Sequence, residues 1–129
     1  MKEVNIPPSS QEAEDAILGA IINAPSIFDE VSAYLSINTL YYERSKVLYS
    51  ILVDMHKNGE SIDMITISGK LSDTDKSRGV TTYYIADLLN NLGASGMALR
   101  YAIQIYEKHL LREVISQTTE ISQSAYKNN

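Results

Sequence analysis

The sequence predicts an all-α protein: a compact bundle of about five short helices followed by one long C-terminal helix. Apolar residues recur at spacings of three and four positions through most of the chain, which is the period of an amphipathic helix. Prolines and glycines mostly fall between these stretches, and none follows Gly96. A chain of 129 residues with 44% apolar residues can bury one core of its own. We therefore expect a flexible lead over residues 1–8, a helical head over 9–93 and the long helix over 94–129.

The composition excludes several classes of protein. The chain has no cysteine, so it has neither a disulfide framework nor a thiolate metal site. No apolar run approaches the roughly 18 residues of a membrane span, and residues 1–10 lack the apolar core of a signal peptide. The formal net charge is −5 and no basic stripe is visible, so we expect no strong direct nucleic-acid binding. These features predict a cytoplasmic protein that does not contact a membrane.

The first helix is predicted to begin at a capping box and to end near Ile22. Ser9 followed by Glu12 matches that motif, in which each side chain satisfies a free amide of the first turn. Gly19 lies inside this helix at a cost of about 1 kcal/mol relative to alanine. A close contact with another helix would explain this glycine, and so would chance. The apolar positions are Ala13, Ile17, Leu18, Ala20, Ile21 and Ile22.

Two further helices follow. Pro25 is expected to begin the second, since proline is favoured at the first helical position. Residues 36–39 are predicted as a turn, and the third helix covers about residues 42–57. Gly59 is expected to end it in the left-handed conformation. The apolar faces are Ile27, Phe28, Val31, Tyr34 and Leu35 in the second helix and Leu48, Ile51, Leu52 and Met55 in the third.

Residues 61–68 fit either a short strand or the start of a helix. Their alternating, β-branched pattern is typical of a strand. Asp63 could instead cap a helix over residues 64–71. One strand would have no partner elsewhere in the chain, which favours the helix. Residues 72–79 are predicted as a polar loop.

The last two helices differ greatly in length. The fifth covers about residues 82–92, with Tyr84, Ile85, Leu88 and Leu89 facing inward and Gly93 ending it. The final helix is expected from Ser95 to about Lys127, near 45 Å at about 1.5 Å per residue. Its apolar positions are Leu99, Ile103, Tyr106, Leu110 and Val114, then Leu111 and Ile115 on a second face, and finally Ile121 and Ala125. Its far end requires cover from another helix, unless it is a frayed terminus.

No nucleotide-binding or catalytic motif is present in the sequence. The one Gly-Lys pair, at residues 69–70, lacks the other positions of a phosphate-binding loop. We interpret His56 and His109 as surface residues rather than metal ligands. Glu12 and Glu14 suit the dipole of a first helical turn better than an acid–base pair. We therefore expect no catalytic, cofactor-binding or metal-binding residue.

The nine tyrosines allow three interpretations. Most are expected as half-buried core residues. A tyrosine combines a large apolar ring with a polar tip and can therefore also anchor a protein interface. Stacking on single-stranded bases is a third possibility, and the acidic balance of the chain argues against it.

Five motifs stand in order along the chain. They are Pro7-Pro8-Ser9-Ser10-Gln11-Glu12-Ala13-Glu14 with Leu18-Gly19; Leu40-Tyr41-Tyr42; Glu60-Ser61-Ile62-Asp63-Met64-Ile65-Thr66-Ile67; Gly79 with Tyr84-Ile85-Ala86-Asp87-Leu88; and Tyr101, Ile105 and Leu110-Leu111-Arg112 with Ile115. Together they resemble the N-terminal domain of DnaB-type replicative DNA helicases over about residues 6–126.

The resemblance implies a non-catalytic domain that acts in DNA replication. In such helicases the long helix is the first arm of a helical hairpin, hairpins of two subunits pair, and three dimers build a collar above the ATPase ring. The residues expected to carry this self-association are Leu110, Val114 and Ile121. The second arm and the RecA-like ATPase domain are not in this sequence. ATP and magnesium are therefore expected only in the rest of the parent 5′–3′ helicase.

The resemblance also implies that the head docks primase or a helicase loader. The matching positions are Glu12 and Tyr84, although the residues alone also allow a capping role for Glu12 and a core position for Tyr84. Two other functions stay open at this point. One is a stand-alone phage or plasmid adaptor that mimics the helicase head, and the other is a small enzyme without a recognisable site.

Overall fold

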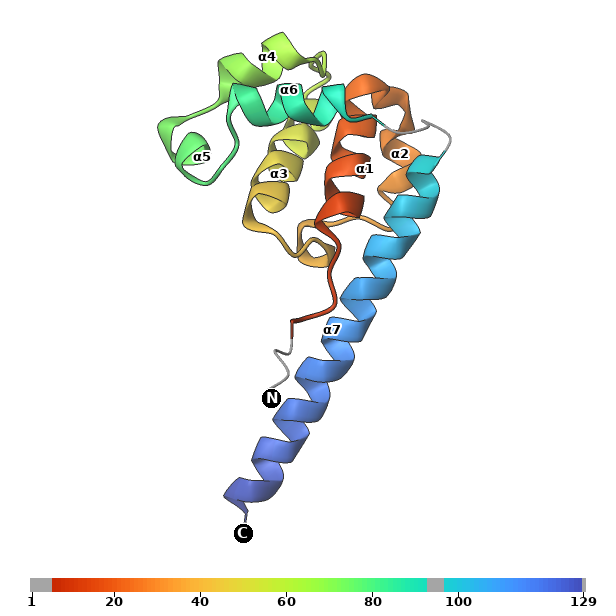
Figure 1. The fold of residues 1–129 in the computed structure, drawn as a ribbon, viewed down its shortest axis with the longest axis vertical. Helices are drawn as coiled ribbons and strands as arrows, with labels where there is room; N and C mark the ends of the chain where they lie inside the picture. The colour runs from red at the N-terminus through yellow and green to blue at the C-terminus, as the bar shows by residue number, and fades with distance from the viewer. Residues whose placement is uncertain (1–5, 93–96, 129) are drawn as a thin grey trace.

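The computed structural model describes residues 6–92 and 97–128, and within them it contains helices and loops but no strand. Short helices pack into a head, and the long helix α7 (Ala98–Lys127) starts beside the head and extends far beyond it (Figure 1). The prediction of an all-α fold with a long C-terminal helix is confirmed. Ser95 and Gly93, the expected start of this helix and end of the preceding one, lie outside the described residues.

Helix α1 (Gln11–Asn23) begins later than the sequence predicts. Ser10 is its N-cap, and the Ser10 hydroxyl accepts a hydrogen bond from the Ala13 N–H at 3.1 Å. The predicted capping box of Ser9 and Glu12 is therefore wrong. Glu12 is the second residue of the helix, so it does not occupy the position that reaches back to the cap.

The second helix is shorter than predicted. Pro25–Ile27 forms a 3-10 turn, η1, and Phe28–Val31 forms the single-turn helix α2. Ser32 then donates its hydroxyl to the Asp29 carbonyl at 3.0 Å, a local bond that competes with helix continuation. The predicted apolar face still lies inward: Phe28, Val31 and Leu35 are buried, and Ile27 and Tyr34 pack partly buried against the core.

The region that follows agrees closely with its sequence. Residues Ile37–Thr39 form a second 3-10 turn, η2, and α3 spans Glu43–Lys57. Gly59 follows α3 with a φ of +66°, as predicted. The ambiguous stretch is a helix, α4 (Met64–Lys70), whose N-cap is Asp63.

A short helix replaces the predicted polar loop. Helix α5 (Asp73–Ser77) forms because Ser72 and Asp75 make a reciprocal capping box with backbone N–H groups, at 3.1 and 3.0 Å. The prediction of a loop over residues 72–79 is therefore wrong. Helix α6 (Thr82–Asn90) follows and buries three of its four predicted apolar residues: Tyr84, Ile85 and Leu88.

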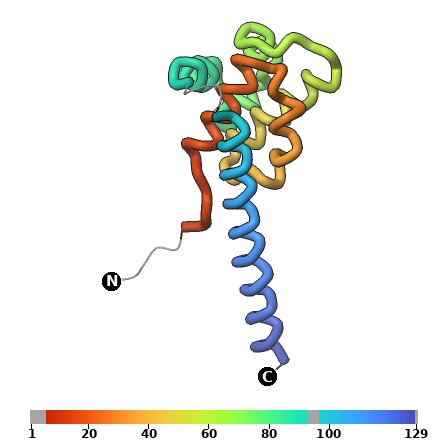
Figure 2. Tube along the Cα trace, turned by 90° about the vertical axis from the view of Figure 1, so that its right-hand side faces the viewer, coloured from red at the N-terminus to blue at the C-terminus, as the bar shows by residue number. Residues whose placement is uncertain are grey.

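Helix α1 lies at the centre of the head. It contacts α3, α6 and α7, and Figure 2 shows α7 running down out of the head. Ile17, Leu18 and Ile21 of α1 are fully buried. The buried residues of α7 are two alanines, Ala98 and Ala102, and one isoleucine, Ile105.

Gly19 marks a close approach of α1 to α6. A Cβ atom at this position would lie 2.9 Å from the Leu88 carbonyl oxygen and 3.1 Å from Leu92 Cδ2. The carbonyl belongs to the backbone and cannot rotate away. The contact explanation for this glycine is thus confirmed, because any larger residue would push the two helices apart.

We predict that Gly19→Ala lowers the free energy of unfolding by up to about 2 kcal/mol, because overpacking usually costs about 1–3 kcal/mol. This cost outweighs the gain in helix propensity, which is about 1 kcal/mol. Chemical denaturation of the variant checks the value. Gly69→Ala is the matched control, since a Cβ there has no neighbour within 4 Å; a Gly19→Ala variant as stable as Gly69→Ala would contradict the close contact.

Candidate protein-docking site

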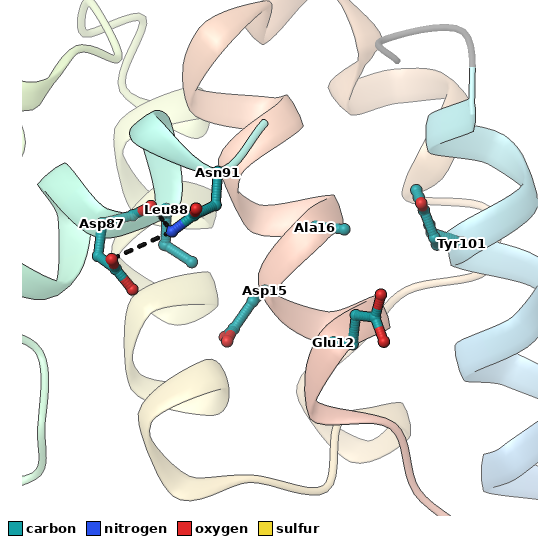
Figure 3. Close-up of a pocket in the computed structure, with 7 residues that line it drawn as sticks. All are labelled: Glu12, Asp15, Ala16, Asp87, Leu88, Asn91 and Tyr101. Atoms are coloured by element: carbon teal, nitrogen blue, oxygen red, sulfur yellow. Dashed lines mark hydrogen bonds between the residues drawn. The ribbon is translucent and has the colours of Figure 1, made fainter. Parts of the chain in front are cut away.

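A groove lies between α1, α6 and α7. Its volume is about 310 Å³. Three of the residues around it are carboxylates, and none is a lysine or arginine. The lining residues are Glu12, Asp15, Ala16, Asp87, Leu88, Asn91 and Tyr101 (Figure 3). The groove therefore presents negative charge beside a tyrosine ring, and it suits a cationic protein surface better than an anionic ligand.

Tyr84 lies behind this groove rather than on it. Only 5% of its surface is exposed, and its hydroxyl donates a hydrogen bond to Asp15 at 2.8 Å. Arg44 covers the ring, with Cζ 4.4 Å from the centroid, and pairs with the second Asp15 oxygen at 3.2 Å. Burial, followed by the bond to Asp15, raises the pKa of Tyr84 far above its ordinary value.

The two predicted docking residues thus differ in position and in exposure. Glu12 is exposed and lines the groove. Tyr84 is largely inaccessible to a docked partner, and it affects the groove by fixing the orientation of Asp15. Asp15 and Asp87 are groove carboxylates that the sequence analysis did not select, since nothing in the local pattern places residues of α1 and α6 together.

Glu14 is a buried carboxylate beneath the same end of α1. It is 1% exposed and accepts the backbone N–H groups of Tyr41 at 2.9 Å and Tyr42 at 3.3 Å. Burial raises the pKa of Glu14 above its ordinary value of 4.5, and the two amides partly oppose that effect. Its role differs from the helix-dipole role that the sequence suggested. The signal for burial was present, because Glu14 shares a helical face with Ile17 and Leu18.

The residues expected to carry self-association lie on the uncovered part of α7. Leu110 is 45% exposed, Val114 59% and Ile121 67%, and Leu111 and Ile115 are each half-exposed. Residues 113–128 are exposed throughout. Spacings of four and seven positions place Leu110, Val114 and Ile121 on one side of the helix. That side has no cover from the described part of the chain.

We searched the described residues for a metal site and for a membrane-spanning helix. They contain no group of three histidine or acidic side chains that could hold a metal ion, and no helix among them could span a membrane. His56 stacks on Phe28 with ring centroids 4.3 Å apart and pairs with Asp29 at 3.1 Å. His109 lies beside Tyr106 on α7. Each histidine ring therefore lies beside an aromatic ring.

Known proteins are similar to this chain in sequence and in fold. A family model for the DnaB-like helicase N terminal domain matches residues 6–107. Replicative DNA helicase DnaC of Bacillus subtilis is 31% identical over 122 residues, which make up 94% of this chain and 27% of that protein. The crystal structure of the N-terminal domain of DnaB helicase from Mycobacterium tuberculosis is similar to this chain with a TM-score of 0.88 at 24% sequence identity. The similar region covers 95% of this chain and 89% of that structure. The structure of a DnaB-like replicative helicase, described with its interactions with primase, has a TM-score of 0.79 at 20% sequence identity. The similar region covers 91% of this chain and 28% of that helicase chain.

The fold and the matched residues define a helical domain of replicative helicases. The chain belongs to the DnaB-like helicase N-terminal domain family, as its five motifs indicate. It spans about a quarter of the length of the curated relative from Bacillus subtilis, at 27%.

Proposed function

We propose that this chain is a non-catalytic assembly and docking module of a replicative DNA helicase that acts in the cytoplasm. Its long helix pairs with that of a second copy, and three such pairs form the collar of a hexamer. The head docks primase or a helicase loader. The ATP and magnesium sites of the parent 5′–3′ helicase belong to its ATPase domain and not to this chain. Membership of the family supports the general role, and the two surfaces described above support its two parts.

The apolar side of α7 carries the assembly proposal. Burying one valine, leucine or isoleucine side chain stabilises an association by about 1.5–3 kcal/mol. Most of the stability of a helix in a protein comes from packing its apolar face, and the uncovered part of α7 would gain that packing from a partner helix. Leu110, Val114 and Ile121 supply the contact side, and their exposure leaves it accessible.

We predict that Leu110→Asp and Val114→Asp weaken self-association, because a buried charge on the contact side is not compensated. Light scattering across a concentration series measures the mass of each protein. Thr119→Asp is the matched control: Thr119 is exposed and lies nine positions from Leu110, on the opposite side of the helix. We expect the native chain and the Thr119→Asp control to be dimers, and both the Leu110→Asp and Val114→Asp variants to be monomers. A monomeric native chain, or variants with unchanged mass, would contradict it.

The acidic groove supports the docking proposal. Its carboxylates project from two helices of the head, and Tyr84 and Arg44 hold Asp15 in place. A partner with basic side chains complements such a surface. Primase is the first candidate because a structurally similar helicase is described with its interactions with primase.

We predict that the C-terminal domain of primase from the same organism binds this chain in a calorimetric titration. Glu12→Ala should weaken the binding about tenfold, or about 1.4 kcal/mol. Tyr84→Phe removes the hydroxyl that holds Asp15 and should have a smaller effect in the same direction. Tyr83→Phe is the control, since Tyr83 is exposed and has no place in the groove. The proposal that primase docks at this groove would be contradicted if the folded native chain did not bind, or if Glu12→Ala bound with full affinity.

A further inference from the structure

Two separate sets of contacts hold α7 against the head. The first is apolar: Ala98, Ala102 and Ile105 are buried at the upper end of the helix, and Tyr106 packs edge-on against Tyr34 of the head with ring centroids 6.1 Å apart. The second is polar and, among the described residues, rests on Arg112, about two turns beyond Ile105. Beyond Arg112 every residue of α7 is exposed. We call the part beyond it, residues 113–127, the arm.

Arg112 bonds two segments that are distant from each other in the sequence. One guanidinium nitrogen donates to the Pro8 carbonyl at 2.7 Å, and the other donates to the Thr39 carbonyl at 2.8 Å. The guanidinium carbon lies 5.3 Å from the centroid of the Tyr41 ring. A planar fork of donors suits two carbonyls at once, and an ammonium group would not reproduce that geometry.

The acceptors of Arg112 are themselves held in place. Thr39 ends η2 and is buried, and Tyr41 is fixed through its N–H group, which donates to the buried Glu14 at 2.9 Å. The N-terminal segment descends from α1 beside α7, as Figures 1 and 2 both show. Its two prolines restrict the backbone that presents the Pro8 carbonyl. Ser9 secures this segment to the head through the Tyr42 hydroxyl at 3.1 Å.

We propose that Arg112, with the Pro8 and Thr39 carbonyls, is a latch that sets the direction of the arm relative to the head. The N-terminal lead supplies one of its two acceptors, and the direction of the arm therefore depends on the lead. Without the latch, the last contact of α7 with the head retreats to Tyr106, which packs against Tyr34. A rotation of about 10° there would displace Lys127 by about 5–6 Å, since the roughly 21 residues between them span about 32 Å.

Distances between paired spin labels test this proposal. The chain has no native cysteine, so Lys57→Cys with Ser124→Cys reports the arm, and Lys57→Cys with Gln104→Cys reports the upper part of α7. All three positions are exposed. An excess of unlabelled protein restricts the measurement to distances within one chain. Arg112→Ala should broaden the arm distance by roughly 5 Å or more and leave the upper distance unchanged.

Three further variants refine the result. Arg112→Lys should give an intermediate width, since one ammonium group bonds a single carbonyl well. Removal of residues 1–8 should also broaden the arm distance, by less than Arg112→Ala, because the Thr39 carbonyl remains. Arg100→Ala, an exposed arginine higher on α7, is the control and should change neither distance.

Unchanged arm distances in Arg112→Ala would overturn the proposal. So would broadening of both distances, because Arg112 would then be needed to dock all of α7 rather than to direct the arm. An unchanged distance after removal of residues 1–8 would exclude the lead from the latch. Circular dichroism establishes that each variant keeps its helices.

Discussion

Glu14 accepts the N–H groups of Tyr41 and Tyr42 from inside the head, and much of the structure depends on this contact. The carboxylate sits at the start of the central helix and fixes the segment that leads into α3. That segment carries the ring beneath Arg112, while the Thr39 carbonyl just before it accepts one of the Arg112 hydrogen bonds. A buried carboxylate is costly unless it is well bonded, so this contact specifies one arrangement of the head.

The same central helix separates two kinds of surface. Its contact with α6 at Gly19 is close enough to bring carboxylates from both helices around one groove. The arm, in contrast, offers apolar side chains and begins where the head ends. Contacts at the groove are electrostatic and screened by salt, whereas burial of the arm depends on apolar area. The two surfaces proposed for an unlike partner and for a second copy therefore differ in chemistry.

The sequence predicts helix caps and apolar helix faces well, because these features depend on residues only a few positions apart. Asp63 as a cap, Gly59 in the left-handed conformation and the apolar faces of α1, α3 and α6 all follow from residues a few positions apart. The boundary errors are also local: Ser10 rather than Ser9 caps α1, and the capping box of Ser72 and Asp75 was overlooked. The site depends on distant pairs instead. Glu14 lies 27 positions from its hydrogen-bond partner Tyr41, Tyr84 lies 69 positions from Asp15, and Arg112 lies 104 positions from Pro8. Pairs this far apart leave no periodic signal in the sequence, although the family motifs contain Glu14, Tyr84 and Arg112.

The pH dependence of stability in Glu14→Gln, compared with the native chain, tests the central claim most directly. The pKa of Glu14 is raised in the folded state, so its stabilisation is present in full below pH 4.5 and is lost as the pH rises through the folded value. We predict that the unfolding free energy of the native chain, minus that of the variant, falls as the pH rises above about 4.5 and then levels off. A constant offset of about 1–3 kcal/mol from the lost acceptor does not alter this trend. A difference that is flat, or that increases with pH, would contradict a carboxylate buried at the centre of the head.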